Sequence, residues 1–293
     1  MKKSFRTALL ILALFAQSCA VSRYATNASY PVAKVDKETQ GSLEEIFFDS
    51  SEPGMTKRRA YVYLPEGYYD SLSTRYPVLY LLHGARGNEC VWIEKGGLLE
   101  SVDSLAGCGA MSPTIVVLPN VNQYNDEKDY GKARLKGAME SFYEVDGTVE
   151  VHFIEDVVRG TDSLLRTIPD KEHRAVAGLS IGAMQSIWLS ANFPDQFAYV
   201  GMFSPMIHPF LKSGPDNSFY RHLNSKQKIQ FQDPPKVYMM TIGKSDFFHP
   251  RIEGWSKSLS KKGYSHEYIC TDGGHQWILW SEYCREFMER LWK

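Results

Sequence analysis

The 293-residue chain has little charge of either sign in excess and no repeated or low-complexity tract. Its 33 Lys and Arg nearly balance its 34 Asp and Glu, so the formal net charge is −1. No basic excess therefore favours nucleic acid or an anionic membrane surface as a partner. Hydrophobic residues make up 43% and charged residues 23%, which is the composition of a globular protein rather than a disordered or fibrous one. The length suffices for one large domain with a substantial core.

Cysteine is scarce, with five in the whole chain. Besides Cys19 there are Cys90, Cys108, Cys270 and Cys284, and four cysteines in an exported protein permit two disulfides in three pairings. Cys270 falls on the last expected strand and Cys284 on the last expected helix, so these two could meet. Buried free thiols that act as small hydrophobes are the alternative. No pair has the spacing of metal ligands, and no His/Cys/Asp cluster predicts a zinc site.

The N-terminal segment differs from the rest of the chain. Three basic residues precede the apolar run 8–16, and Cys19 follows soon after. This order is typical of a secretory signal peptide, and the run is too short for an ordinary membrane-spanning helix. The cysteine resembles that of a bacterial lipobox, although Ala16 stands where leucine is usual. We therefore expect residues 1–19 to be a lipoprotein-type signal peptide with a lipidated Cys19, and residues 20–40 to be a polar tether.

The alternative at this end of the chain is a signal peptide that ordinary signal peptidase cleaves nearby. Both alternatives predict export to the cell envelope. The lipoprotein hypothesis adds attachment to a membrane through the N-terminal lipid, and no contact with nucleic acid is expected under either.

Strand-like apolar runs alternate with helical patterns through the remaining chain, 41–293. The runs cover 42–48, 58–64, 76–83, 114–119, 174–179, 197–203, 236–242 and 265–271. The alternation predicts βαβ units in a mostly parallel sheet of about eight strands with helices on both faces, and an antiparallel hairpin from the first two strands.

Two apolar stripes at helical spacing are expected to pack against this sheet. The first consists of Phe153, Val157, Leu164 and Ile168. The second consists of Trp277, Trp280, Cys284, Phe287 and Leu291. The second stripe favours core packing over an aromatic ligand site.

The sequence Gly178-Leu179-Ser180-Ile181-Gly182 follows directly on the apolar run 175–177. A G-x-S-x-G pentapeptide between a strand and a helix is the nucleophile elbow of α/β-hydrolases. The serine occupies a strained turn that exposes its Oγ, and the glycines remove Cβ atoms that would clash there. Ile181 opens the helix, so its backbone N–H is a candidate donor to an oxyanion.

An acid and a histidine follow in the chain order of this fold. Asp246 comes after the expected strand 236–242, and His275 comes after 265–271 and a glycine turn. The order Ser…Asp…His is that of α/β-hydrolases, and all three candidates lie just past the carboxyl ends of strands, where open α/β sheets place their sites. Asp272 is more plausibly part of the turn beside His275, and Asp195 follows the elbow helix, so Asp246 is the predicted acid.

A second oxyanion donor is expected after the strand 76–83. This strand runs into His83-Gly84-Ala85, and a His-Gly pair at this place supplies the backbone N–H of the following residue. That residue is Ala85. Taken alone, the segment could be a plain strand-ending turn.

Two long polar segments, 120–147 and 204–235, interrupt the alternation. Loops of this length in a compact domain are usually functional, so we expect them to border the site and bind substrate. Tyr124 and His208 are candidate contacts within them, and Trp92 is a third because it is near Ala85 in sequence. Ordinary packing is the alternative for each.

These motifs resemble the putative-esterase family of α/β-hydrolases, which includes the feruloyl and acetylxylan esterases of carbohydrate esterase family 1, S-formylglutathione hydrolase and the antigen 85 mycolyltransferases. The resemblance covers about residues 43–292. It rests on Leu81-Leu82-His83-Gly84 with Asn88 and Trp92, on Ala177 to Gly182, on Gly243-Lys244-Ser245-Asp246 and on Gly273-Gly274-His275-Gln276-Trp277. Ala183 departs from the family, whose members usually carry glycine there.

For an exported protein, the resemblance implies a carbohydrate esterase that hydrolyses feruloyl or acetyl esters of plant polysaccharide such as xylan. Ser180 would attack the ester, His275 would take its proton, and Asp246 would orient the imidazole, with no metal or organic cofactor. An acyltransferase on the same fold and a non-catalytic glycan-binding surface protein are the alternatives. The intact set of three residues argues against the binding protein.

Overall fold

The computed structural model describes residues 39–51, 57–85, 87–121, 148–206 and 222–293. Within them eight strands form one sheet in the order β1-β2-β4-β3-β5-β6-β7-β8. The strands are β1 (Ser42–Asp49), β2 (Lys57–Leu64), β3 (Val78–Leu82), β4 (Ile115–Pro119), β5 (Arg174–Leu179), β6 (Tyr199–Phe203), β7 (Val237–Gly243) and β8 (Glu267–Thr271). Each of the eight predicted strands is present, with ends that agree to within two residues.

The sheet is mostly parallel, as expected. β1 and β2 form the predicted antiparallel hairpin, β2 also runs antiparallel to β4, and the other five strand pairs are parallel. Because parallel neighbours need a crossover between them, helices cover both faces, and the central strands β3, β4, β5 and β6 are buried along their whole length. The carboxyl ends of the parallel strands therefore share one edge.

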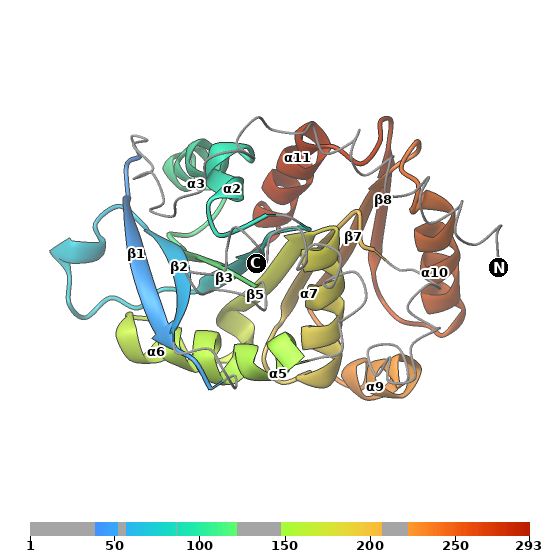
Figure 1. Cartoon of the computed structure of the whole chain (residues 1–293), viewed down its shortest axis with the longest axis horizontal. Coiled ribbons are helices and arrows are strands. Elements are labelled where there is room, and N and C mark those ends of the chain that lie inside the picture. Colours follow the sequence, from blue (N-terminus) through green and yellow to red (C-terminus); the bar gives the residue numbers. More distant parts are fainter. Residues whose placement is uncertain (1–38, 52–56, 86, 122–147, 207–221) are drawn as a thin grey trace, which may run out of the picture.

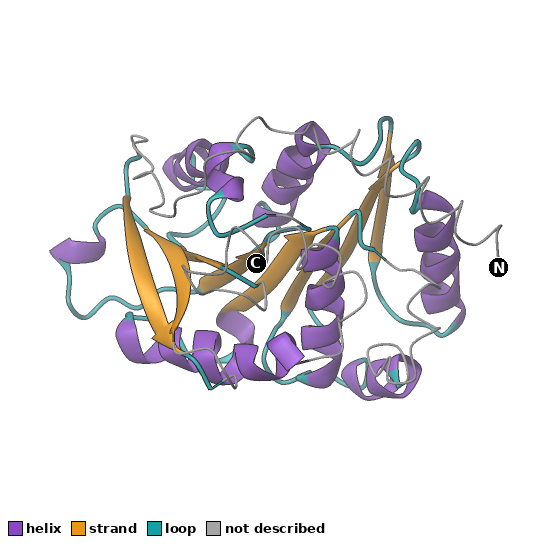
Figure 2. Ribbon diagram, viewed as in Figure 1, coloured by secondary structure: helices purple, strands orange, loops and turns teal. Residues whose placement is uncertain are grey.

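Helices form a layer on each side of the sheet (Figures 1 and 2). One layer contains α2 (Val91–Glu94), α3 (Leu98–Gly107) and α11 (Trp277–Met288). The other contains α5 (Thr148–Phe153), the π-helical η3 (Ile154–Val158), α6 (Arg159–Leu164), α7 (Ile181–Asn192), α9 (Leu223–Gln230) and α10 (His249–Lys261). Two short 3-10 helices, η2 (Tyr68–Asp70) and η4 (Lys171–His173), complete the described elements. Alternate residues of each strand point to opposite faces of the sheet, so the strands contribute side chains to a hydrophobic core on each face.

The first predicted apolar stripe is only half correct. Phe153 and Val157 are buried, but Leu164 is 59% exposed and Ile168 lies beyond the end of α6. The π-helical segment η3 separates α5 from α6 and shifts the helical register. The buried face continues to Thr161 instead, and Leu164 turns to solvent.

α9 was not expected, because it lies inside the segment 204–235 and shows no apolar periodicity. The residues that it buries are polar, Gln227 and Gln230. A sequence pattern of apolar residues therefore could not reveal this helix.

The second stripe packs as predicted. Trp280, Cys284, Phe287 and Leu291 are buried in the core under α11, and Trp277 is half-buried against it. Cys270, by contrast, packs on the opposite face of the sheet with the core under α10. The sheet separates the two thiols, so the disulfide between Cys270 and Cys284 is not formed. All four cysteines of the described residues are free.

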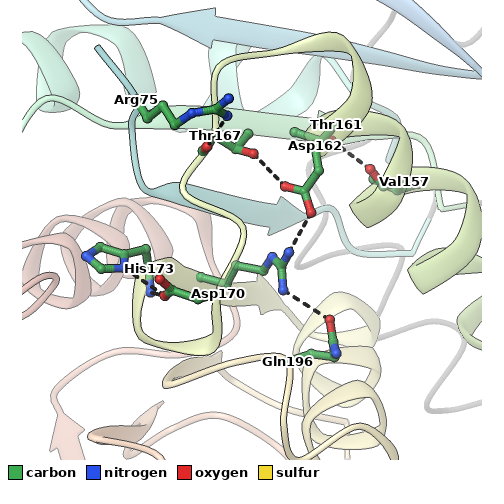
Figure 3. A network of polar contacts seen from close by, with 9 residues as sticks. Arg75, Val157, Thr161, Asp162, Thr167, Asp170, His173 and Gln196 are labelled. Carbon is green, nitrogen blue, oxygen red and sulfur yellow. Dashed lines mark hydrogen bonds and ion pairs between the residues drawn. The ribbon is translucent and has the colours of Figure 1, made fainter. Parts of the chain in front are cut away.

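A polar network ties the amino end of β5 to its surroundings (Figure 3). Arg174, the first residue of β5, donates to Asp162 Oδ2 at 2.5 Å and to Gln196 Oε1 at 3.1 Å. Thr167 donates its hydroxyl to the other oxygen of Asp162 at 2.6 Å, and Arg75 donates to the carbonyl of Thr167 at 3.0 Å. These bonds fix the connection from α6 to β5.

No helix in the described ranges has the length and apolar character needed to cross a bilayer. The N-terminal segment with Cys19 lies outside the described residues, as do most of the two long polar segments with Tyr124 and His208.

Candidate active site

Ser180 stands in a strained turn between β5 and α7. Its φ of 54° and ψ of −109° fall in a region that residues with a Cβ rarely adopt. A Cβ on Gly182 would lie only 2.5 Å from the carbonyl oxygen of His83, so glycine is required there. The neighbouring strand holds the turn, because the Ser180 N–H donates to Phe203 O at 2.9 Å and the Met206 N–H donates to Ser180 O at 3.2 Å.

The three predicted catalytic residues meet in one chain of hydrogen bonds. His275 Nε2 lies 3.2 Å from Ser180 Oγ, and His275 Nδ1 lies 2.8 Å from Asp246 Oδ2. All three are at least 96% buried. The second oxygen of Asp246 accepts the Phe248 N–H at 2.9 Å, so the carboxylate is held in place to orient the imidazole.

The loop after β7 and the turn after β8 interlock, which brings the acid and the histidine together. A Cβ on Gly243 would lie 2.3 Å from the carbonyl oxygen of Gly273. The Lys244 N–H donates to Thr271 O at 2.7 Å and the Ser245 N–H donates to Gly273 O at 2.8 Å. These backbone bonds set the separation of Asp246 from His275.

The other two candidate acids face away from the histidine. Asp272 has a side chain that is 92% exposed and pairs with Lys244 at 2.8 Å, and this pairing lowers the pKa of its carboxyl group. Asp195 is exposed beyond the last turn of α7, at the opposite end of that helix from Ser180. The geometry therefore selects Asp246 among the three.

Aromatic side chains surround the imidazole of His275. The ring of Trp280 meets it edge-on with centroids 4.8 Å apart, Phe247 lies at 4.7 Å, and Phe248 lies at 5.7 Å. These rings pack around the imidazole and fix its orientation. A low-dielectric setting strengthens its hydrogen bonds to the acid and the serine.

The two backbone N–H groups predicted to stabilise an oxyanion belong to Ile181 and Ala85. Ile181 is the first residue of the 12-residue helix α7, so its N–H has no partner within the helix and lies at the positive end of the helix dipole. Ala85 follows Gly84, and a Cβ on Gly84 would lie 2.3 Å from Leu179. Within the described residues, neither N–H group forms a hydrogen bond.

A model of one protein family matches residues 51–284, about four fifths of the chain, and its description is "Putative esterase". The chain belongs to the Putative esterase family. Its eight-stranded sheet and the position of Ser180 after β5 agree with this membership.

Curated relatives of this family member include an endo-1,4-beta-xylanase/feruloyl esterase of Xylanibacter ruminicola, 28% identical over 86% of this chain and 32% of the relative. An acetyl esterase of Caldicellulosiruptor saccharolyticus is 24% identical over 73% of this chain and 83% of the relative. The chain spans about a third of the length of the first of these relatives.

Among solved structures, a CE1 ferulic acid esterase from the anaerobic fungus Anaeromyces mucronatus matches with a TM-score of 0.69 and 22% identity, over 90% of this chain and 95% of that one. An S-formylglutathione hydrolase from Staphylococcus aureus matches with a TM-score of 0.60 and 15% identity, over 86% of this chain and 97% of that one. At these identities the likeness establishes the fold, which is the predicted α/β-hydrolase fold.

Trp92, a predicted substrate contact, packs in the core between the sheet and α11. It is 1% exposed, its indole N–H donates to Leu82 O at 3.0 Å, and its ring packs edge-on against Trp277 with centroids 5.4 Å apart. That Trp92 contacts substrate stays a prediction, and these contacts give it a packing role. Closeness to Ala85 in sequence did not show that the first turn of α2 points this side chain into the core.

A buried polar group behind the oxyanion turn was not predicted. His83, Glu89 and Asn120 are each at most 3% exposed, and Asn120 Nδ2 donates to Glu89 Oε2 at 2.8 Å. Arg59 on β2 pairs with the other oxygen of Glu89. The His-Gly sequence marks His83, but nothing in the sequence marks Glu89 as buried, because its ion pair joins residues 30 positions apart. In the described ranges, no three His, Cys, Asp or Glu side chains gather as a metal site.

Proposed function

We propose that the protein is a serine esterase that releases feruloyl or acetyl groups from plant polysaccharide such as xylan. The observation that carries the proposal is the chain Ser180–His275–Asp246, with hydrogen-bond separations of 3.2 and 2.8 Å, at the carboxyl edge of the sheet. Such a chain activates a hydroxyl group for acyl transfer.

In this mechanism Ser180 Oγ attacks the ester carbonyl carbon while its proton passes to His275 Nε2. Asp246 accepts the Nδ1–H of His275 and stabilises the imidazolium that forms. The negative oxygen of the tetrahedral intermediate accepts hydrogen bonds from the N–H groups of Ile181 and Ala85. The C–O bond to the alcohol then breaks, and His275 gives the proton to the leaving oxygen.

The second half of the reaction reverses these roles with water. His275 Nε2 takes a proton from water, and the resulting hydroxide attacks the acyl group on Ser180. The ester bond to Ser180 breaks, the carboxylic acid leaves, and the proton returns to the serine. Every transfer uses groups of this chain and a water molecule, so no cofactor takes part.

The names of the relatives support the choice of acyl group. One is named endo-1,4-beta-xylanase/feruloyl esterase, another is named acetyl esterase, and a solved neighbour is named CE1 ferulic acid esterase. All three names specify an esterase for a feruloyl or an acetyl group. Tyr124 and His208, in the two long polar segments, remain our candidates for contacts with the polysaccharide.

Purified protein assayed on methyl ferulate, acetylated xylan, an aryl acetate and a long-chain fatty acyl ester tests this proposal. We expect kcat/KM to be highest for a feruloyl or acetyl ester. A Ser180→Ala variant distinguishes the proposed site from any other, and Ser104→Ala, at an exposed serine of α3, is the matched control. A preference for the fatty ester would overturn the carbohydrate substrate but leave the mechanism standing.

We also propose that the protein is exported and held at the cell envelope by lipid on Cys19. The basic start, the apolar run 8–16 and the cysteine that follows support this. A Cys19→Ser variant should move from the membrane fraction to the soluble fraction and keep its esterase activity. Unchanged membrane association of that variant would contradict lipid attachment at Cys19.

A further inference from the structure

The imidazole of His83 holds a single protonation form. The side chain is 3% exposed, and its Nε2 accepts the backbone N–H of Val121 at 3.1 Å. Because a backbone N–H can only donate, Nε2 carries a lone pair and Nδ1 carries the proton. Nδ1 lies 2.9 Å from Gly84 O and donates to it. Burial lowers the pKa of His83, which keeps this neutral form.

The carbonyl that His83 binds belongs to the same peptide unit as the N–H of Ala85. In a trans peptide the C=O and N–H bonds point in opposite directions, and the described residues contain no cis peptide. Gly84 O also accepts the Gly87 N–H at 3.0 Å. His83 and Gly87 thus hold the carbonyl oxygen of the 84–85 peptide in place. Because the peptide is rigid, they also fix the direction of the Ala85 N–H, which is opposite to that of the carbonyl.

The same arrangement occurs one step further from the site. Arg58, which is fully buried, donates from Nη1 to Asn120 O at 2.8 Å. Asn120 O shares a peptide unit with the Val121 N–H, which is the group that donates to His83. All donors therefore point the same way, from Arg58 through the 120–121 peptide and His83 to the 84–85 peptide.

We propose that this hydrogen-bond chain, with His83 as its central positioning residue, aims and polarises the Ala85 N–H of the oxyanion hole. Each donor in such a chain strengthens the next, and the buried guanidinium of Arg58 places positive charge at its far end. The inference rests on the proposed esterase function and on Ala85 as an oxyanion donor. The chain acts through the Ala85 peptide and does not itself touch the substrate.

Two variants of His83 separate its two hydrogen bonds. In His83→Asn the amide nitrogen replaces Nδ1 and can still donate to Gly84 O, whereas in His83→Gln the amide oxygen replaces Nε2 and keeps only the contact with Val121. We expect His83→Gln to lose about 10- to 100-fold in kcat with little change in KM, somewhat less than the loss of an entire oxyanion donor. His83→Asn should lose at most about threefold, the part that polarisation through Val121 contributes, because it keeps the hydrogen bond that aims the Ala85 N–H.

Inhibition by an aryl boronic acid supplies a readout that a purely structural role would not move. The boronate on Ser180 places an oxygen in the oxyanion hole, so its Ki should rise in His83→Gln by about the same factor as kcat/KM falls. Equal losses in both variants, or losses that follow thermal stability alone, would overturn the proposal. The esterase function is tested separately, by activity of the wild type that Ser180→Ala abolishes. Failure of the esterase proposal can therefore be told apart from failure of the His83 proposal.

A measurement on the unaltered protein covers the case in which a variant does not fold. Long-range 1H–15N NMR of histidine-labelled protein should show His83 protonated at Nδ1 only, from about pH 5 to 8, where an ordinary histidine titrates. A proton on Nε2, or titration of His83 in step with an exposed histidine, would contradict the chain.

Discussion

The two ends of β5 have opposite characters, although Arg174 and Ser180 are only six positions apart in the chain. At the amino end, Arg174 forms an ion pair with Asp162 and a hydrogen bond with Gln196. At the carboxyl end, Ser180 adopts a φ of 54° and leaves two N–H groups nearby without partners in the described residues. One end stabilises the fold, and the other uses that stability to hold a strained, reactive turn.

Catalysis and stability can therefore be changed separately by substitutions at the two ends of β5. Substitutions at the carboxyl end should alter turnover far more than the free energy of unfolding. Substitutions at the amino end should do the reverse, since nothing there lies near the Ser180–His275 pair.

The largest expected effect is that of Ser180→Ala. Loss of Oγ removes the nucleophile, so kcat should fall by roughly 10⁴-fold or more, to the residual catalysis of the oxyanion hole and binding. The melting temperature should change little, because the Cβ and the backbone turn remain. Turnover of an aryl acetate measures the first effect and calorimetry the second. Wild-type turnover in this variant would show that another residue is the nucleophile.

Asp246→Asn should have the next largest effect. The amide keeps the shape of the carboxylate but favours the wrong imidazole tautomer, which costs on the order of 10⁴ in kcat in serine proteases. Asp272→Asn is the matched control, because Asp272 lies close in sequence to His275 but pairs with Lys244 at the surface. A greater loss in the control than in Asp246→Asn would refute the assignment of the acid.

At the amino end, Arg174→Met should lower stability and leave catalysis unchanged. Methionine keeps most of the apolar stem but leaves Asp162, whose side chain is 20% exposed, without its ion-pair partner. Breaking a buried ion pair costs about 3–5 kcal/mol, and partial exposure of this pair reduces the expected loss to about 2 kcal/mol. Denaturant unfolding measures it. A fall in kcat without a fall in stability would contradict the claim that the amino end of β5 contributes to stability and not to catalysis.

Features of the fold and the site that depend on local sequence were predicted, whereas features that depend on the direction of a side chain were not. The eight strands and the order of Ser180, Asp246 and His275 depend on local apolar runs and on the rule that parallel strands end at one edge. The burial of Trp92 and the separation of Cys270 from Cys284 depend on which face each side chain takes. Sequence distance does not determine that face.

The features that sequence pattern missed are those made by polar or backbone groups. Helix α9 buries glutamines and has no apolar stripe. The π-helical segment η3 shifts the register of the buried residues. The chain from Arg58 to Ala85 runs through two peptide units, whose partners are set by tertiary contact and not by residue type.

The smallest expected effect concerns pH and again separates the two ends. Burial lowers the pKa of His83, outweighing the contact with Gly84 and the nearby charge of Glu89, while Arg58 lowers it further. The unfolded chain therefore binds a proton near the ordinary histidine pKa of about 6.5, whereas the folded chain does not. The stability that neutral His83 contributes is present above about pH 6.5 and is lost as pH falls toward its folded-state value.

The slope of this loss is at most about 1.4 kcal/mol per pH unit, the value for one proton. Asparagine does not titrate. As pH falls from about 7 to 5, the wild type should therefore lose more unfolding free energy than His83→Asn does. Arg174→Met should keep the wild-type slope, since the amino end contains neither His83 nor its partners. Urea unfolding of the three proteins at several pH values tests this. Parallel curves for the wild type and His83→Asn would show that His83 takes up its proton equally in the folded and unfolded chains.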